Sequence, residues 1–205
     1  MDSRARMKID MSGGQIRLDK ELNDLDRFVM DFIQILEKNE VNYVLVSGYL
    51  SILFGRSRSS EDIDLIVEKI PKDRFTAMWK DIMASFYCLP TDNPDIAYET
   101  YLMAPTSVRF SRRGAPIPNI EFKFPKVDLD RWVLKNSRRV LLNGKTIRIS
   151  PVELQIAYKL FLNSEKDIED ARYLYRLFAE KLDQNLLKSS LEKLDKVDDF
   201  NKYLK

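Results

Sequence analysis

The stretch YVLVSGYLSILFGRSRSSEDIDLIV, residues 43–67, decides the fold. It opens with the apolar, β-branched run of residues 43–46, which is typical of a short buried strand. The pair Ser47-Gly48 then ends this run and predicts a sharp turn into a helix over 49–54. A second apolar run, residues 62–67, begins with acidic side chains and predicts another buried strand. Two strands joined by a helix and a loop indicate a chain of mixed α and β structure.

The second of these strands carries two carboxylates at alternate positions. Because side chains alternate across a strand, Asp62 and Asp64 point to one face while Ile63 points into the core. Two anions so placed repel each other, and Mg²⁺, which prefers carboxylate oxygens together with substrate phosphates, removes that repulsion. Glu121, on a strand expected over 119–124, is a third candidate ligand, and such a set suits one or two ions. The alternative interpretation is that D-x-D is an exposed strand end.

Small and basic residues between the two strands suit phosphate binding. Ser47 and Gly48 would let a phosphate approach the backbone N–H groups at the start of the helix. Arg56 and Arg58 follow that helix in a loop, where they would balance the charge of an incoming nucleoside triphosphate (NTP). For both arginines, the alternative is a solubilising surface charge.

Hydrophobic periodicity predicts the elements around this stretch. Apolar residues at three- and four-residue steps indicate a helix from Leu18 to about Asn39, and a second such stripe follows Pro71. A pair of strands is expected over 98–110 and a single strand over 119–124. Asn143-Gly144, which lies between two apolar runs, predicts a two-residue hairpin.

The sequence after residue 150 is expected to be helical. Residues 150–153, Ser-Pro-Val-Glu, combine an N-cap hydroxyl, a proline at the first helical position and a capping-box glutamate. Two further helices are predicted over about 166–181 and 184–195. We therefore expect an α+β fold with a mixed β-sheet flanked by helices, divided into a flexible arm at 1–17, a core at 18–149 and a C-terminal helical region at 150–205.

Composition excludes several kinds of chemistry. The 205 residues include no histidine, which removes the usual general base, the usual zinc ligand and the partner of a nucleophilic serine or cysteine. The single cysteine, Cys88, excludes an internal disulfide and is typical of a reducing compartment, so a cytoplasmic protein is expected.

The net charge of +2 gives no overall field toward nucleic acid. No apolar run reaches the roughly 18 residues of a membrane span, so no membrane association is expected.

The order of strand, Ser-Gly turn, helix, basic loop and D-x-D strand resembles the nucleotidyltransferase superfamily over residues 43–67. That superfamily carries a Gly-Gly or Gly-Ser turn followed by an acidic pair on the next strand. This chain departs from the pattern in having Ser47 where the first glycine usually sits. The resemblance implies a nucleotidyltransferase fold and the magnesium-dependent transfer of a nucleoside monophosphate from an NTP to an acceptor hydroxyl.

A second resemblance lies between residues 149 and 170. This segment is similar to the C-terminal part of AbiEii-type toxin nucleotidyltransferases, which pair a K-L helix with a downstream D-x-x-D. The resemblance implies that Lys159 neutralises triphosphate charge, and that Asp167 or Asp170 positions or deprotonates the acceptor hydroxyl. It also implies a tRNA end or a protein side chain as acceptor, and a separately encoded antitoxin as partner. A solvated lysine and a capped helix start are the alternative.

Three other interpretations stay open from the sequence. A non-catalytic nucleotide-binding or interaction module would keep this fold without turnover, since the turn at Ser47 is altered. A small-molecule nucleotidyltransferase of the antibiotic-modifying kind would share the first motif but not the Lys159 match. Arg109, Arg112 and Arg113 are also a candidate patch for an RNA backbone, although such charges are common on edge strands.

Overall fold

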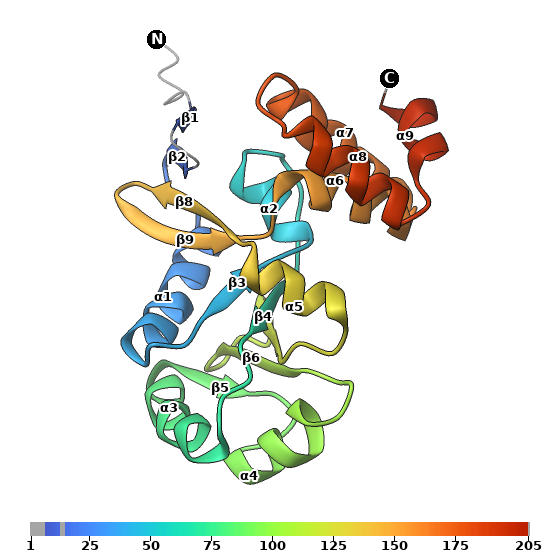
Figure 1. The fold of residues 1–205 in the computed structure, drawn as a ribbon. Helices are drawn as coiled ribbons and strands as arrows, with labels where there is room; N and C mark the ends of the chain where they lie inside the picture. The colour runs from blue at the N-terminus through green and yellow to red at the C-terminus, as the bar shows by residue number, and fades with distance from the viewer. Residues whose placement is uncertain (1–6, 13–14, 205) are drawn as a thin grey trace.

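The computed structural model describes residues 7–12 and 15–204, and within them nine strands form one mixed sheet in the order β1-β2-β8-β9-β3-β4-β7-β6-β5 (Figure 1). The strands are β1(Lys8–Ser12), β2(Gln15–Asp19), β3(Tyr43–Leu45), β4(Asp62–Val67), β5(Phe86–Cys88), β6(Val108–Arg112), β7(Asn119–Lys123), β8(Arg138–Leu142) and β9(Lys145–Ile149). The helical elements are α1(Asp24–Lys38), α2(Gly48–Leu53), α3(Lys72–Ser85), α4(Pro94–Ile96), the π-helical turn η1(Ala97–Leu102), α5(Asp128–Lys135), α6(Val152–Leu162), α7(Glu165–Phe178), α8(Gln184–Lys193) and α9(Val197–Tyr203). The expected α+β fold, with a mixed sheet flanked by helices and a helical C-terminal region, is confirmed.

The centre of the sheet places the acidic residues side by side. β4 pairs antiparallel with β3 and parallel with β7. In the parallel pair, Asp62 lies opposite Asn119 and Asp64 lies opposite Glu121. Because residues opposite each other on neighbouring strands face the same way, Asp64 and Glu121 share one face of the sheet.

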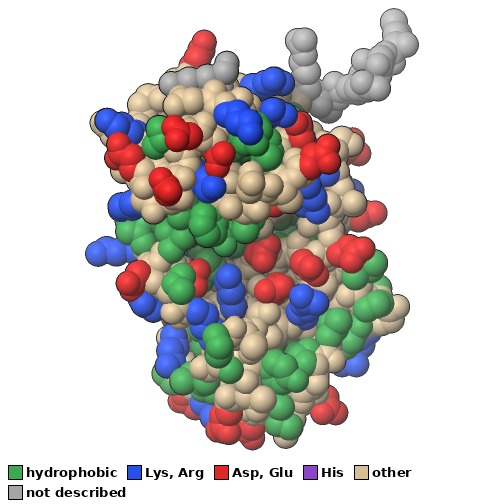
Figure 2. Space-filling view, turned by 90° about the vertical axis from the view of Figure 1, so that its right-hand side faces the viewer, with side chains coloured by type: hydrophobic (Ala, Val, Ile, Leu, Met, Phe, Trp, Pro, Cys, Tyr) green, Lys and Arg blue, Asp and Glu red, His purple; other side chains and the backbone are tan. Residues whose placement is uncertain are grey.

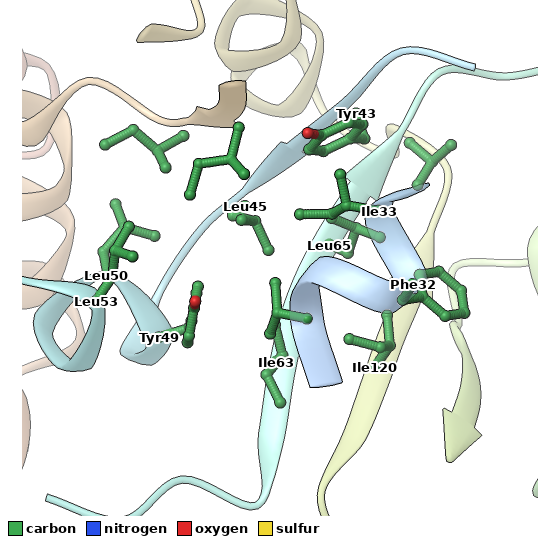
Figure 3. Packing of buried hydrophobic residues seen from close by; sticks show 14 of the residues in the cluster. Phe32, Ile33, Tyr43, Leu45, Tyr49, Leu50, Leu53, Ile63, Leu65 and Ile120 are labelled. Carbon is green, nitrogen blue, oxygen red and sulfur yellow. The ribbon is translucent and has the colours of Figure 1, made fainter. Parts of the chain in front are cut away.

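The other face of these strands is packed against α1. Phe32 and Ile33 of α1 lie against Ile63 and Leu65 of β4 and Ile120 of β7 (Figure 3). All five side chains are at most 1% exposed. The isoleucine between the two aspartates therefore anchors β4 in the core, which fixes the opposite direction of both carboxylates.

The carboxylate face is covered in part by α5, on the opposite side of the sheet from α1 and α3 (Figure 1). Val44 and Ile66 pack there against Val133 of α5 and Leu154 of α6. The C-terminal helices gather at one end of the molecule beside α2, where the Phe54 and Phe178 rings meet edge to face at 4.8 Å between centroids (Figure 1). Helices α5 and α6 thus pack on the face of the sheet that carries the carboxylates.

The expectation of a flexible arm over residues 1–17 is wrong for residues 8–12 and 15–17. These residues form β1 and most of β2, and β2 pairs in parallel with β8. Ile16 and Leu18, both at most 2% exposed, alternate with exposed residues as in a strand. This alternation is too short, in a mostly polar segment, to predict the strand from sequence. Residues 1–6 and 13–14 of the expected arm lie outside the described residues.

The predicted start of the first helix at Leu18 is also wrong. Leu18 belongs to β2, and the helix begins at Asp24. Asn23 caps it, because its side chain accepts a hydrogen bond from the Asp26 backbone N–H at 2.8 Å while the Asp26 carboxylate accepts one from the Asn23 N–H at 3.0 Å. The capping box lies five residues beyond the first apolar position of the predicted stripe.

The pair of strands predicted over 98–110 is half wrong. Tyr98 lies in the π-helical turn, and only Val108 onward forms a strand. The helical start is set by Asn93, which caps Pro94–Ile96. Tyr98 is then held by packing on Phe75, with ring centroids 5.6 Å apart, and by donating a hydrogen bond to the Ile70 carbonyl oxygen at 2.9 Å. Tertiary packing overrides the local aromatic preference for a strand.

The hairpin predicted at Asn143-Gly144 is present between β8 and β9. The capping box predicted over 150–153 is not formed. The Ser150 hydroxyl is buried without a hydrogen-bond partner among the described residues, and Glu153 instead accepts a hydrogen bond from the Asp183 backbone N–H at 2.9 Å. Helices α5 and α9 were not predicted, because their short stripes lie within charged sequence.

Candidate active site

Three carboxylates lie on two adjacent strands at the α5 face of the sheet. Asp62 and Asp64 come from β4, and Glu121 comes from β7 in register with Asp64. Each has a polar partner. Asp62 Oδ1 accepts a hydrogen bond from Asn119 Nδ2 at 2.7 Å, and Glu121 Oε2 lies 3.3 Å from Arg109 Nη2. The structure thus brings the predicted acidic set onto one face.

Asp64 is the electrostatic centre of this set. Burial raises the pKa of its carboxyl, and the negative charge of Glu121 raises that pKa further. A hydrogen bond from the Ser47 side chain and the positive charges of Lys123 and Lys159 offset part of this rise. The excess negative charge between Asp64 and Glu121 is the condition that a bound cation would relieve.

The turn before α2 brings its backbone next to Asp64. Ser47 adopts φ 63° and ψ −138°, a conformation that favours glycine. The buried Gln155 of α6 holds this turn, because its Oε1 accepts a hydrogen bond from the Ser47 backbone N–H at 3.1 Å. At Gly48, an added Cβ would lie only 2.6 Å from Arg58 Nη2, so the guanidinium of Arg58 packs directly on the glycine. The Ser-Gly pair therefore lies beside Asp64, and its role in phosphate binding stays a prediction.

Asp170 lies at the centre of a buried ion-pair cluster. Its side chain is fully buried and forms ion pairs with Arg56, with Arg58 and with Lys159, whose Nζ is 3.1 Å from Asp170 Oδ2. Lys159 is itself 3% exposed and also binds Asp167 Oδ1 at 2.6 Å. The cluster, named here the Asp170 cluster, consists of Arg56, Arg58, Lys159, Asp167 and Asp170. It joins the loop after α2 to α6 and α7.

Within this cluster the two aspartates differ in their surroundings. Burial acts to raise the pKa of Asp167, but hydrogen bonds from Lys159 and Ser164 and the charge of Arg58 hold that pKa below its usual value. Asp167 therefore stays charged and is a weak base. Asp170, with no exposed surface and three cationic partners, does not face a space in which an acceptor would sit. The residues predicted from the C-terminal motif do come together, but in a buried network.

Two further side chains belong to the candidate site, although the sequence motifs did not identify them. Lys123 follows Glu121 by two residues on β7 and thus shares its face. Among the described residues, the Lys123 side chain has no hydrogen bond or ion pair, and its positive charge lowers the pKa of Asp64. Tyr158 of α6 is half-buried, and the pKa of its hydroxyl is raised by burial and by the charges of three carboxylates, Asp64 among them. The alternation of residues 119–124 predicts that Lys123 shares the face of Glu121. The position of Tyr158 has no such local signal, because it depends on how α6 packs.

The residues present fit Mg²⁺ in the type of their donors. Asp62, Asp64 and Glu121 all offer carboxylate oxygens, which hard divalent cations prefer, from one face of adjacent strands. In the described part of the chain, no three acidic, cysteine or histidine side chains are grouped closely enough to hold a metal as they stand. As they stand, Asp62 contacts Asn119 and Glu121 contacts Arg109.

The predicted RNA patch is largely taken up by internal contacts. Arg109 pairs with Glu121, Arg112 pairs with Asp31, and Arg113 Nη2 donates to the Met83 carbonyl oxygen at 3.0 Å. These guanidinium groups therefore have partners within the chain, and RNA binding at this patch stays a prediction.

The face that bears α5 and the C-terminal helices is hollowed across its middle (Figure 2). Acidic side chains gather on one side of this hollow, and hydrophobic side chains gather on the other (Figure 2). A separate cavity of about 660 Å³ lies beside the loop that precedes β4, lined by residues such as Phe28, Ile52, Arg58 and Pro118. Its lining includes none of the three carboxylates, so this cavity is not the candidate active site.

The fold of this chain is similar to that of nucleotidyltransferase-like proteins of known structure. One solved structure with this fold is an antigenic nucleotidyltransferase-like protein from Paracoccidioides brasiliensis, with a TM-score of 0.52 and 18% identity over 86% of this chain and 90% of that chain. Another is the antibiotic-resistance factor ANT(2'')-Ia, with a TM-score of 0.51 and 11% identity over 86% of this chain and 96% of that chain. No protein-family model and no curated protein sequence matches the chain. The similarity to the nucleotidyltransferase superfamily is thus confirmed at the level of fold, and the AbiEii-type relationship stays a prediction.

Among the described residues, no helix has both the length and the apolar character needed to cross a lipid bilayer.

Proposed function

We propose that this protein is a magnesium-dependent nucleotidyltransferase, which moves a nucleoside monophosphate from an NTP to an acceptor hydroxyl and releases pyrophosphate. The observation that carries the proposal is the pairing of Asp64 with Glu121 on adjacent strands, beside a Ser-Gly turn, in a nucleotidyltransferase fold. Burying two like charges together is unfavourable unless a cation uses them.

In this proposal Asp62, Asp64 and Glu121 hold one or two Mg²⁺ ions. When bound, the metal neutralises phosphate charge and favours attack by the acceptor hydroxyl. Lys123 binds a phosphate oxygen directly, because it shares the face of Glu121 and has no partner among the described residues. Gly48 brings its backbone N–H to the phosphates, whereas the Ser47 N–H is bound to Gln155, and the Ser47 side chain orients Asp64.

The Asp170 cluster supports the turn before α2. Arg58 packs on Gly48 while it pairs with Asp170, and Gln155 binds the Ser47 backbone N–H, so both groups hold the turn. The charges of Arg56, Arg58 and Lys159 favour an anionic NTP through their field. Asp167, the more exposed aspartate of the cluster, is the better candidate for orienting an acceptor hydroxyl.

The proposed acceptor is a tRNA end or a protein side chain in the cytoplasm, with an antitoxin as regulatory partner. This part of the proposal rests on the similarity of Lys159, Asp167 and Asp170 to the AbiEii-type motif. The antibiotic-resistance factor that shares the fold makes aminoglycosides the comparison acceptor.

A second candidate function is a non-catalytic nucleotide-binding or interaction module. Two observations favour it. Ser47 stands where the superfamily usually has a glycine, and no three acidic side chains among the described residues are grouped closely enough to hold a metal. This candidate predicts magnesium-dependent NTP binding without release of pyrophosphate.

The deciding experiment incubates the wild type, Asp64→Ala and Glu61→Ala with Mg²⁺ and each NTP labelled at the α-phosphate. Total tRNA, cell extract and aminoglycosides serve as separate acceptors. We expect the wild type and Glu61→Ala to transfer label to tRNA or protein, and Asp64→Ala to lose at least about 100-fold in rate. Glu61 is the control because it is exposed and adjoins the same strand. Nucleotide binding without transfer to any acceptor would support the non-catalytic module.

A further inference from the structure

Helix α6 carries a pair of stacked aromatic rings beside the proposed site. The Tyr158 and Phe161 rings lie 5.9 Å apart between centroids, with an angle of 26° between their planes. Phe161 is 50% exposed, whereas the other phenylalanines of the chain are buried. An exposed ring stacked on a half-buried one costs hydrophobic free energy, which a ligand that covers it would recover.

The inner ring of this pair, Tyr158, is close enough to the acidic residues to interact with their charges. The charges of Asp130, Asp64 and Asp167, from α5, β4 and α7, all act on the Tyr158 hydroxyl. The same helix holds the Ser47 turn through Gln155 and the Asp170 cluster through Lys159. Along α6, Gln155 and Phe161 are six residues apart, which corresponds to about 9 Å. One helix thus spans from the phosphate side of the site to an exposed aromatic surface.

These features together define the chemistry of an occupant. One end must be anionic, because it meets Lys123 and a candidate cation site at Asp64. The other end must be flat and apolar, because it meets the face of an aromatic ring. The hydrophobic side of the hollow in Figure 2 lies across from the acidic side, as such a two-ended ligand requires. A nucleoside triphosphate has both ends.

We propose that the base of the bound nucleotide stacks on Phe161 and extends the Tyr158–Phe161 stack, while its phosphates lie at Lys123 and Asp64. This inference rests on the proposed function and adds the base subsite to it. Since stacking uses the face of the ring and not its edge, all four bases bind, and purines bind more tightly than pyrimidines because they cover more of the ring.

Binding to the full-length protein tests the subsite. Equilibrium dissociation constants are measured with Mg²⁺ for α,β-methylene-ATP and for inorganic tripolyphosphate, which lacks the base. The variants are Phe161→Ala, Phe161→Trp and Leu162→Ala, the last of which removes a neighbouring side chain that is 43% exposed. We expect Phe161→Ala to weaken the nucleotide analogue roughly tenfold and tripolyphosphate not at all, Phe161→Trp to bind as the wild type does, and Leu162→Ala to change neither.

The outcomes separate this inference from the proposed function. If Phe161→Ala binds the analogue as tightly as the wild type, the base lies elsewhere and the subsite is wrong, while the transferase proposal stands. An equal loss for the analogue and tripolyphosphate would also contradict stacking. If the wild type binds neither ligand, both proposals are overturned.

Discussion

The position of Asp64 suits the proposed metal site but is unfavourable for the stability of the folded protein. It carries a charge in a partly buried place, opposite a second carboxylate on the neighbouring strand. Active-site groups held in this way often reduce stability, because the protein retains them for binding and not for folding. The cost of Asp64 should therefore be visible in the stability of the metal-free protein.

We predict that Asp64→Asn is more stable than the wild type at pH 7 in the presence of a chelator. Burial and Glu121 raise the pKa of Asp64 in the folded state, so its contribution to stability is present below the unfolded-state pKa of about 3.8 and is lost as the pH rises through the folded-state pKa. The gap in stability between the two proteins should close as the pH falls toward that value.

Urea denaturation over this pH range measures the effect, with Glu61→Gln as the matched control on an exposed carboxylate. Added Mg²⁺ should raise the melting temperature of the wild type and leave Asp64→Asn nearly unchanged. A variant that is less stable than the wild type at every pH would contradict this account of Asp64.

Ser47 carries a backbone strain that the usual glycine would not. Its φ of 63° with ψ of −138° lies in a region where a Cβ is unfavourable by about 1–3 kcal/mol. We predict that Ser47→Gly is more stable than Ser47→Ala by at least about 1 kcal/mol, since both lose the hydroxyl and only glycine also loses the Cβ. Chemical denaturation of both variants measures the difference. Equal stabilities would mean that the turn is not strained.

At the level of elements, the Asp170 cluster ties α7 to α6 and to the loop after α2. Removing one partner of a buried charge network leaves the others uncompensated, which typically costs about 3–5 kcal/mol. We predict a loss of this size for Asp170→Asn, because Arg56, Arg58 and Lys159 would share no anion at its position.

The matched variant is Asp167→Asn, which leaves Asp170 in place and should cost only about 1 kcal/mol. Unfolding of both proteins in urea, together with their transferase activity, distinguishes a supporting role from a direct one. Loss of activity in Asp170→Asn without loss of stability would assign Asp170 to the substrate instead.

The elements that could be predicted from sequence are those with an uninterrupted local signal. The run before Ser47, the D-x-D strand and the hairpin at Asn143-Gly144 each depend on neighbouring residues, and each is present. Strands β1 and β2 could not be predicted in this way, because β2 is stabilised by pairing with β8, more than 120 residues away. The helical conformation of Tyr98 could not be predicted for the same reason, because its partners lie in α3 and in the loop before α3.

The candidate site shows the same limit. The alternation of residues on β4 and β7 placed Asp62, Asp64 and Glu121 on one face, and register between the strands then brought Asp64 opposite Glu121. Spacing alone did not reveal that Asp170 is enclosed by three cations, because those cations come from two other segments. Motif order predicted the proximity of these groups but not their burial.

At the scale of the whole molecule, the C-terminal helices share the core of the sheet. Leu160, Leu174 and Phe178 are fully buried in the same hydrophobic cluster as Phe54. α6 also begins directly after β9, where the Ser150 backbone N–H donates to the Leu45 carbonyl oxygen of β3 at 3.0 Å. The boundary expected at residue 150 therefore crosses a continuous core.

We predict that a chain ending at Ile149 does not fold cooperatively. Loss of Leu160, Leu174 and Phe178 removes about 2 kcal/mol of burial each, roughly 6 kcal/mol in all, against a net stability that is typically about 5–15 kcal/mol. The fragment would also leave Asp64 without the charge of Lys159 and the Ser47 turn without Gln155. Thermal unfolding followed by circular dichroism tests this, with the full chain as reference. A sharp single transition in the fragment would instead establish the C-terminal helices as a separable domain, in which case α6 would reach the acidic strands only by docking.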